Sequence, residues 1–213
     1  MADAARIQRD IRGTAGYLDL VRKQGALRIQ AATAGRLRRA MAGVSRADLA
    51  RRPAPGKWSI KEIICHLADV EVVNGWRYRM ILAQSGSPLT AFDQERWADE
   101  MAYRRQNPAL ALEAFTALRR RHVALMRATP RSAWTRFGVH EERGRLSFHA
   151  LVDWIAAHDL NHLAQVARLR RLLATRRRPG SPEPAPPPHY CCCPHPAGVS
   201  LPFPCRPAAP AVC

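Results

Sequence analysis

Apolar residues recur every three or four positions in four stretches of the chain, a spacing typical of amphipathic helices. The stretches cover about residues 15–42, 59–83, 108–129 and 147–173, and Gly25 and Gly35 interrupt the first of them. No stretch alternates convincingly between apolar and polar residues, although residues 134–140 are compatible with a short extended segment. The pattern therefore predicts an all-α protein that folds as an up-down-type four-helix bundle.

Two of the expected helices have clear start signals. Ser59 and Glu62 have the spacing of a capping box at the start of the second helix. The third helix starts at Asn107–Pro108, an N-cap residue followed by proline at the first helical position. The connection between these two helices, residues 84–107, is long enough to form a functional lid or short helices of its own.

The composition changes near Thr175. Beyond this residue proline is too dense for a helix or a central strand, and no apolar periodicity remains. We therefore expect one folded domain at residues 1–175 and a disordered, low-complexity tail at residues 176–213. Five of the six cysteines fall in this tail and do not form a disulfide framework. The tail residues His189, Cys191, Cys192, Cys193 and His195 lack the spacing of a structural zinc site.

The chain is strongly basic, with 34 lysines and arginines against 17 acidic residues. Such an excess is common in proteins that bind nucleic acids or anionic surfaces. Residues 51–100 are nevertheless balanced in charge, and the arginine clusters elsewhere lie at or near helix ends without interleaved aromatic residues. We therefore expect no specific nucleic-acid partner. No long apolar run or signal-peptide pattern occurs, so we expect a cytoplasmic protein without a membrane partner.

Histidines lie on the expected inward faces of two helices. His158 and His162 share one stripe of the fourth helix with apolar residues such as Ile155 and Val166, and His66 borders the apolar face of the second helix. Two imidazoles at positions i and i+4 can bind one divalent cation, and a third from a facing helix leaves positions open for water or substrate. The alternative is that these histidines only pack in the core. The other five are interpreted as surface or loop residues: His122, His140, His149, His189 and His195.

Several neighbours of these histidines are candidates for supporting roles. Asp69 follows His66 by three residues and could accept its second ring N–H. Asp159 is interpreted as a surface residue or a support of the histidines. Arg77 lies on nearly the same helical face as His66 and could bind a carboxylate or phosphate of a ligand, the alternative being a salt bridge. Cys65 should project away from the histidines, which argues against a role as nucleophile.

The sequence HDLNH, starting at His158, is similar to the HExxH signature of zinc proteases with Asp159 replacing the glutamate. Aspartate is one methylene shorter, and no third ligand follows at a protease spacing. A protease is therefore disfavoured.

The segments KWSIKEIICHLADVE and HDLNHLAQVARLR together resemble the DinB-like family of bacterial metal-binding four-helix bundles. The resemblance covers about Arg36 to Leu173. In that family one histidine of the second helix and an HxxxH pair of the last helix bind the metal, which carries over to His66, His158 and His162. The resemblance also implies zinc or nickel as the metal, often a homodimer, and a relation to transferases that use bacillithiol or mycothiol.

A metal site of this kind has a direct chemical consequence. Three neutral imidazoles leave the cation its full charge, so a bound thiol should lose its proton and attack an electrophilic small molecule. The expected function is therefore metal-dependent thiol transfer. Water in place of the thiol would give a metal-dependent hydrolase, and a metal-binding stress or scaffold protein without catalysis is a further alternative.

Overall fold

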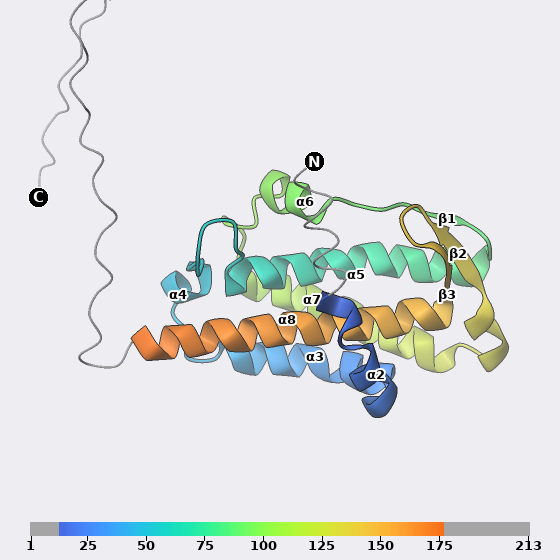
Figure 1. Cartoon of the computed structure of the whole chain (residues 1–213), viewed down its shortest axis with the longest axis horizontal. Helices are drawn as coiled ribbons and strands as arrows, with labels where there is room; N and C mark the ends of the chain where they lie inside the picture. Colours follow the sequence, from blue (N-terminus) through green and yellow to red (C-terminus); the bar gives the residue numbers. More distant parts are fainter. Residues whose placement is uncertain (1–12, 177–213) are drawn as a thin grey trace, which may run out of the picture. The chain divides into compact units, whose positions relative to one another are not determined.

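The computed structural model describes residues 13–176, and four long helices make up most of this part (Figure 1). Shorter helices, α2 (Leu18–Gln24) and α4 (Arg46–Ala50), lie before and after the first of the four. The predicted four-helix bundle is confirmed. Its long helices are α3 (Ala26–Met41), α5 (Ile60–Ala83), α7 (Pro108–Ala128) and α8 (Phe148–Arg176).

The path of the chain through the bundle departs from simple up-and-down alternation. α3 packs against α7 and α8, and α5 packs against the same two helices. α3 and α8 run in one direction, whereas α5 and α7 run in the other (Figure 1). The reason is the long connection between α5 and α7, which carries the chain back to the end of the bundle where α5 began. As a result, α5 and α8 are antiparallel neighbours.

The start signals of α5 and α7 act as the sequence predicts. The Ser59 hydroxyl accepts a hydrogen bond from the Glu62 amide, and the Glu62 carboxylate accepts one from the Ser59 amide at 2.9 Å, which completes the capping box. The Asn107 side chain accepts a hydrogen bond from the Ala109 amide at 3.0 Å. Each cap satisfies backbone N–H groups that have no partner within the helix, which stabilises a helix by about 1 kcal/mol.

The first predicted helix is divided at Gly25, between α2 and α3. Gly25 has a φ of +83°, a value that residues with a side chain rarely adopt, so the chain turns here at little cost. Gly35 stays inside α3 without breaking it.

A small three-stranded sheet lies at one end of the bundle, at the end of α5 and the start of α8 (Figure 1). β1 (Pro88–Leu89) pairs in parallel with β2 (Phe137–His140), which pairs antiparallel with β3 (Gly144–Ser147). The sequence analysis suggested only a brief extended segment here, because strands of two to four residues are too short to show alternation. The connection from α5 to α7 also contains α6 (Gln94–Glu100), and a 3₁₀ helix (Arg131–Thr135) follows α7.

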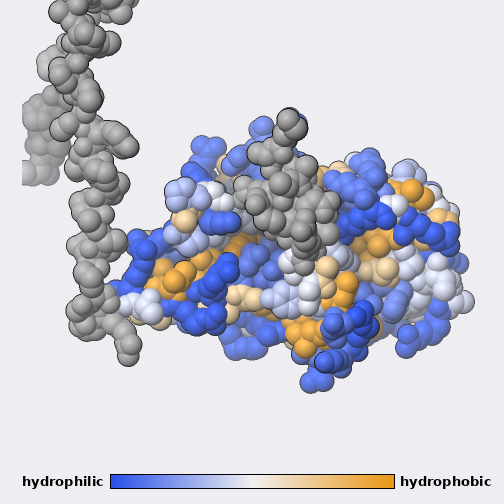
Figure 2. Space-filling view, viewed as in Figure 1, coloured by the Kyte–Doolittle hydropathy of each residue, from blue (hydrophilic) through white to orange (hydrophobic). Residues whose placement is uncertain are grey.

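The surface of the described part is largely hydrophilic on the face shown in Figure 2, with smaller hydrophobic areas. None of the helices within residues 13–176 is long and apolar enough to span a lipid bilayer. The last helix ends at Arg176, close to the predicted domain boundary. The prediction of a disordered tail, with its cysteines and with His189 and His195, falls outside the residues that the structure describes.

Candidate metal centre

Three imidazoles from two antiparallel helices meet inside the bundle. His66 extends from α5, and His158 and His162 extend from successive turns of α8. The Nε2 atom of His158 lies 3.2 Å from Nε2 of His66 and 3.1 Å from Nε2 of His162. One nitrogen of each ring lies within 4.8 Å of the others. The structure thus brings together the three histidines that the sequence singled out.

The surroundings keep two of these rings in the neutral form. His66 and His162 are buried, and His158 is partly exposed. Burial lowers the pKa of His66 and of His158 well below the usual range, and the neighbouring imidazoles add to the effect. A neutral imidazole is the form of histidine that binds a metal.

The hydrogen bonding of the three rings fits a metal site. Nδ1 of His66 and Nδ1 of His158 are buried without a hydrogen-bond partner, while Nδ1 of His162 lies 3.1 Å from Oε1 of Gln165. Each neutral ring has one N–H and one lone pair, so three facing Nε2 atoms cannot all be satisfied by one another. A divalent cation would accept all three lone pairs, and nitrogen ligands of this type suit zinc and nickel.

The predicted contact between Asp69 and His66 is not formed. The Asp69 carboxylate accepts a hydrogen bond of 2.6 Å from the hydroxyl of Tyr103, in the connection that follows α6. Although Asp69 and His66 lie on the same side of α5, this buried tyrosine draws the carboxylate away from the ring. The neighbour of His66 is instead Trp58, with ring centroids 4.8 Å apart.

Asp159 is neither a surface residue nor a support of the histidines. It is fully buried and belongs to a second polar cluster that joins all four long helices. Its carboxylate accepts hydrogen bonds from the guanidinium of Arg119 and from the hydroxyl of Thr33. Burial raises the pKa of Asp159, and Arg119 offsets part of this rise. The remaining members of this cluster, which we call the ionic cluster, are Gln30, Glu71 and His122.

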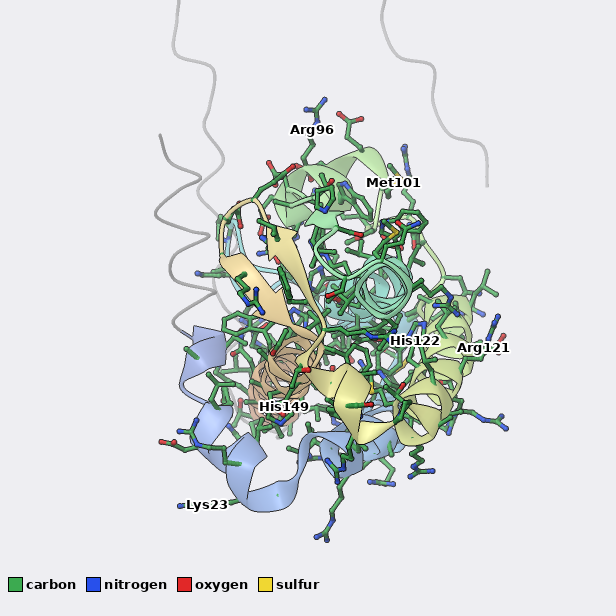
Figure 3. All side chains as sticks on the ribbon, turned by 90° about the vertical axis from the view of Figure 1, so that its right-hand side faces the viewer. Lys23, Arg96, Met101, Arg121, His122 and His149 are labelled. Carbon is green, nitrogen blue, oxygen red and sulfur yellow. The ribbon has the colours of Figure 1, made fainter. Side chains whose placement is uncertain are left out.

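The interpretation of His122 as a surface residue was also wrong. His122 lies between α5 and α7, whereas its neighbour Arg121 points outward (Figure 3). Nδ1 of His122 lies 2.8 Å from a carboxylate oxygen of Glu71. A sequence signal for this cluster existed, because Glu71 falls on the buried stripe of α5 between Leu67 and Tyr78. His149, by contrast, is exposed on the first turn of α8, as expected (Figure 3).

A cavity of about 120 Å³ extends from the three histidines along α5. Its walls include Arg77, as well as Phe92 and Gln94 from the long connection. Arg77 forms no salt bridge among residues 13–176; its Nη2 donates to the carbonyl oxygen of Thr90 at 2.6 Å and lies 3.1 Å from Nε2 of His140.

His140 is buried on β2, which corrects its interpretation as a surface or loop residue. It lies on β2 and contributes to the cavity wall together with Arg143, from the turn between β2 and β3. No pattern in the sequence pointed to either residue.

Cys65 is buried in the hydrophobic core, and burial raises the pKa of its thiol to about 12. A thiol in such surroundings stays protonated at neutral pH and is a poor nucleophile. Within residues 13–176, where Cys65 is the one cysteine, the protein therefore offers no reactive sulfur to the histidines.

Comparison with known proteins places this geometry in a family. A protein of Oceanobacillus iheyensis is 25% identical over 114 residues, which cover 54% of this chain and 66% of that protein. A protein of Bacillus licheniformis is 26% identical over 131 residues, which cover 60% of this chain and 74% of that protein. Both carry provisional names as metal-dependent hydrolases.

The solved structure of YfiT from Bacillus subtilis has a similar fold, with a TM-score of 0.66 at 18% identity over 70% of this chain and 86% of YfiT. YfiT is described as a probable metal-dependent hydrolase with an unusual four-helix bundle topology. The family model of the DinB superfamily matches residues 30–166. This chain belongs to the DinB superfamily.

Proposed function

We propose that this protein is a metal-dependent enzyme in which His66, His158 and His162 hold one zinc or nickel ion. The observation that carries the proposal is the convergence of three Nε2 atoms, two of them on rings whose other nitrogen has no partner. We further propose that the reaction is the transfer of a low-molecular-weight thiol, such as bacillithiol or mycothiol, to an electrophilic small molecule.

The residues around the site would have different roles in such a reaction. A divalent cation held by neutral imidazoles keeps its positive charge and lowers the pKa of a coordinated thiol or water. His66, His158 and His162 fix its position, and Trp58 covers one side of the His66 ring. Because Cys65 is enclosed in the core, residues 13–176 offer no competing thiolate at this place.

Of two cavities that His162 lines, only the one along α5 also includes His66 and His158. The second, of about 500 Å³, has walls that include Lys57, Trp58, Gln165 and Arg168. Gln165 contacts Nδ1 of His162, so this second cavity lies on the side of the ring that faces away from the other two histidines. A substrate would therefore reach the three Nε2 atoms through the cavity along α5.

The second candidate function is metal-dependent hydrolysis, which the provisional names of the relatives favour. The same three histidines would then hold a cation that activates water. A third alternative is a metal-binding protein without catalysis. The three candidate functions share the same metal ligands and differ in whether the protein consumes thiol, consumes water or catalyses no reaction.

The test measures both reactions on one preparation. Zinc-loaded and nickel-loaded protein is mixed with chlorodinitrobenzene and either bacillithiol or mycothiol, and the loss of free thiol is followed. Ester and amide substrates are tested without thiol. We expect metal-dependent thiol consumption that is lost in His158→Ala. Hydrolysis without thiol consumption would establish the second candidate, and neither reaction with a fully loaded site would favour the binding protein.

The resemblance also suggests a homodimer, which stays a proposal. Val72 and Trp76 lie one turn apart on α5 and are 58% and 63% exposed, unusually high values for large apolar side chains. We propose that they contribute to the contact between two copies. Sedimentation of the protein and of Trp76→Lys would test this, with a dimer expected only for the unchanged protein.

A further inference from the structure

Two arginines lie in the wall of the cavity that begins at the histidines. Arg77 belongs to α5 and is only 8% exposed, and Arg143 belongs to the turn between β2 and β3. The guanidinium of Arg143 stacks on the ring of Trp154, with its carbon 4.0 Å from the ring centroid. Arg77 is held by Thr90 and His140. Both side chains are therefore held beside the cavity by contacts that do not neutralise their positive charges.

Neither positive charge is neutralised by an ion pair among residues 13–176. Glu141 accepts a hydrogen bond from the backbone amide of Ala91, and Glu142 lines the cavity but is exposed and bonded to neither arginine. Burial lowers the pKa of Arg77 to about 10, and the charge of Arg143 contributes to this. Arg77 is buried and Arg143 is exposed, so the cost of a buried charge without an ion pair falls on Arg77. A ligand with a negative charge would remove this cost.

The same wall contains polar atoms that lack a partner. Nε of Arg77 and Oδ1 of Asn74 are both buried without a hydrogen bond, and Asn74 is only 1% exposed. Buried polar atoms of folded proteins are nearly always hydrogen-bonded, so unpaired ones in a cavity wall are available to a molecule bound in the cavity. They lie on the side of the cavity where the arginines are.

The positions along α5 show that such a ligand would be elongated along the helix axis. His66, Val70, Asn74 and Arg77 all line the cavity and follow one another at steps of four, four and three residues, which is one face of the helix. A rise of 1.5 Å per residue places Arg77 about 16 Å from His66 along the helix axis. The wall between them is partly apolar, with Val70, Leu151 and Ile155.

We propose that this cavity binds an elongated substrate with a terminal carboxylate, which lies at Arg77 and Arg143 while the reactive end lies at the three histidines. The planar guanidinium group matches the planar carboxylate and binds it with two hydrogen bonds where geometry allows. This inference rests on the proposed function of the histidines and adds the class of substrate. It assigns a role in substrate binding to Arg143, and it makes the β2–β3 turn part of the site.

The test uses ω-mercaptoalkanoates of increasing chain length as probes, from mercaptopropionate to mercaptoundecanoate. Their thiol can bind the metal, and their carboxylate can reach the arginines only at a suitable length. The matching ω-mercaptoalcohols have the same thiol without the charge. Binding to the full-length, cobalt-loaded protein is measured by calorimetry, and the cobalt–thiolate absorption band separately reports whether the thiol reaches the metal.

We expect the carboxylate to bind about tenfold or more tightly than the alcohol at one range of lengths, which is the usual effect of a hydrogen bond to a charged group. Arg143→Met should remove most of this preference without changing the cobalt content. Arg145→Met is the matched control, because Arg145 lies on the same hairpin, is exposed and stacks on Phe137 outside the cavity. Arg77→Met should also remove most of the preference for the carboxylate, provided that the hairpin of β2 and β3 stays folded.

The outcomes separate this inference from the proposed function. A cobalt–thiolate band with equal affinities for carboxylates and alcohols at every length would leave the metal site standing and overturn the carboxylate site. Equal loss of preference in Arg145→Met and Arg143→Met would overturn it as well. If the protein takes up no cobalt, the proposed function fails. The same calorimetry on metal-free protein then tests the carboxylate site by itself. Binding of the carboxylate that Arg143→Met abolishes would support this site, and no binding would overturn it.

Discussion

Two buried polar clusters lie side by side in the bundle, and consecutive residues of α8 belong to different ones. His158 points to His66 and His162, whereas Asp159 points to Arg119 in the ionic cluster. In the ionic cluster all four carboxylate oxygens of Asp159 and Glu71 accept hydrogen bonds or contact a ring nitrogen. Among the three histidines two ring nitrogens have no partner.

The difference between the clusters separates a structural role from a binding role. The ionic cluster pairs opposite charges within the protein and ties residues of α3, α5, α7 and α8 to one another. Burial alone would raise the pKa of Glu71, but Arg119 and His122 outweigh it and lower the pKa. The three histidines instead face one another through their Nε2 atoms, and they border a cavity. Burial by itself therefore does not identify a functional polar group; the histidines differ in that three ring nitrogens converge beside a cavity.

The largest effect is expected from breaking the ionic cluster. Arg119→Met leaves Glu71 and Asp159 buried without their cation, so the free energy of unfolding should fall by about 3–5 kcal/mol. Urea unfolding of the metal-free protein measures this change. Arg120→Met removes the same charge from an exposed neighbour and should change stability by less than about 0.5 kcal/mol. Equal effects of the two substitutions would contradict a structural role for the cluster.

Substitution of the metal-site histidines should have a smaller effect, and this effect should be on metal binding. His66→Ala and His162→Ala each remove a ligand and should weaken zinc binding by at least about a hundredfold, because even losing a residue that only supports a ligand costs 10–100-fold. His122→Ala should keep zinc binding and lose about 1–3 kcal/mol of stability, since Glu71 loses a partner. Metal content and urea unfolding are measured on all three variants. Equal loss of metal in all three would mean that the clusters are not functionally distinct.

The smallest expected effect concerns His140 at the far end of the cavity. Burial, together with Arg77 and Arg143, lowers the pKa of His140 to about 4. The ordinary pKa of a histidine is about 6.5, so between about pH 6.5 and 4 the His140 ring binds a proton in the unfolded chain but not in the folded protein. The free energy of unfolding should therefore fall as the pH drops through this range. His140→Gln should reduce this fall by on the order of 1 kcal/mol in urea unfolding at the two pH values, because solvent screens part of the effect.

His149→Gln is the control for this experiment, because it removes an exposed histidine of α8 that does not line the cavity. An unchanged pH dependence in His140→Gln would show that its ring is not held in the neutral form.

The sequence predicts those features that depend on local patterns. The starts of α5 and α7 follow from residues that bond to backbone groups two or three positions away, Ser59, Glu62 and Asn107. The approach of His66 to the HxxxH pair follows from apolar periodicity, because all three lie on stripes that must face the interior.

Features that depend on distant partners could not be predicted in this way. The burial of His122 depends on Glu71, 51 residues away, and that of His140 on Arg77, 63 residues away. Arg143 reaches the cavity only because three very short strands pair at the end of the bundle. The Asp69 contact was predicted from helical spacing alone, which could not anticipate the hydroxyl of Tyr103.

The central claim is that His66, His158 and His162 form a metal site, and elemental analysis tests it most directly. The full chain, a chain that ends at Arg176 and the His158→Ala variant of each are purified and offered zinc and nickel. The shorter chain excludes the cysteines of the C-terminal region as the source of metal. We expect about one ion per chain in both lengths and its loss in both variants. A shorter chain that takes up neither metal, or a variant that keeps it, would mean that the three histidines do not form the site.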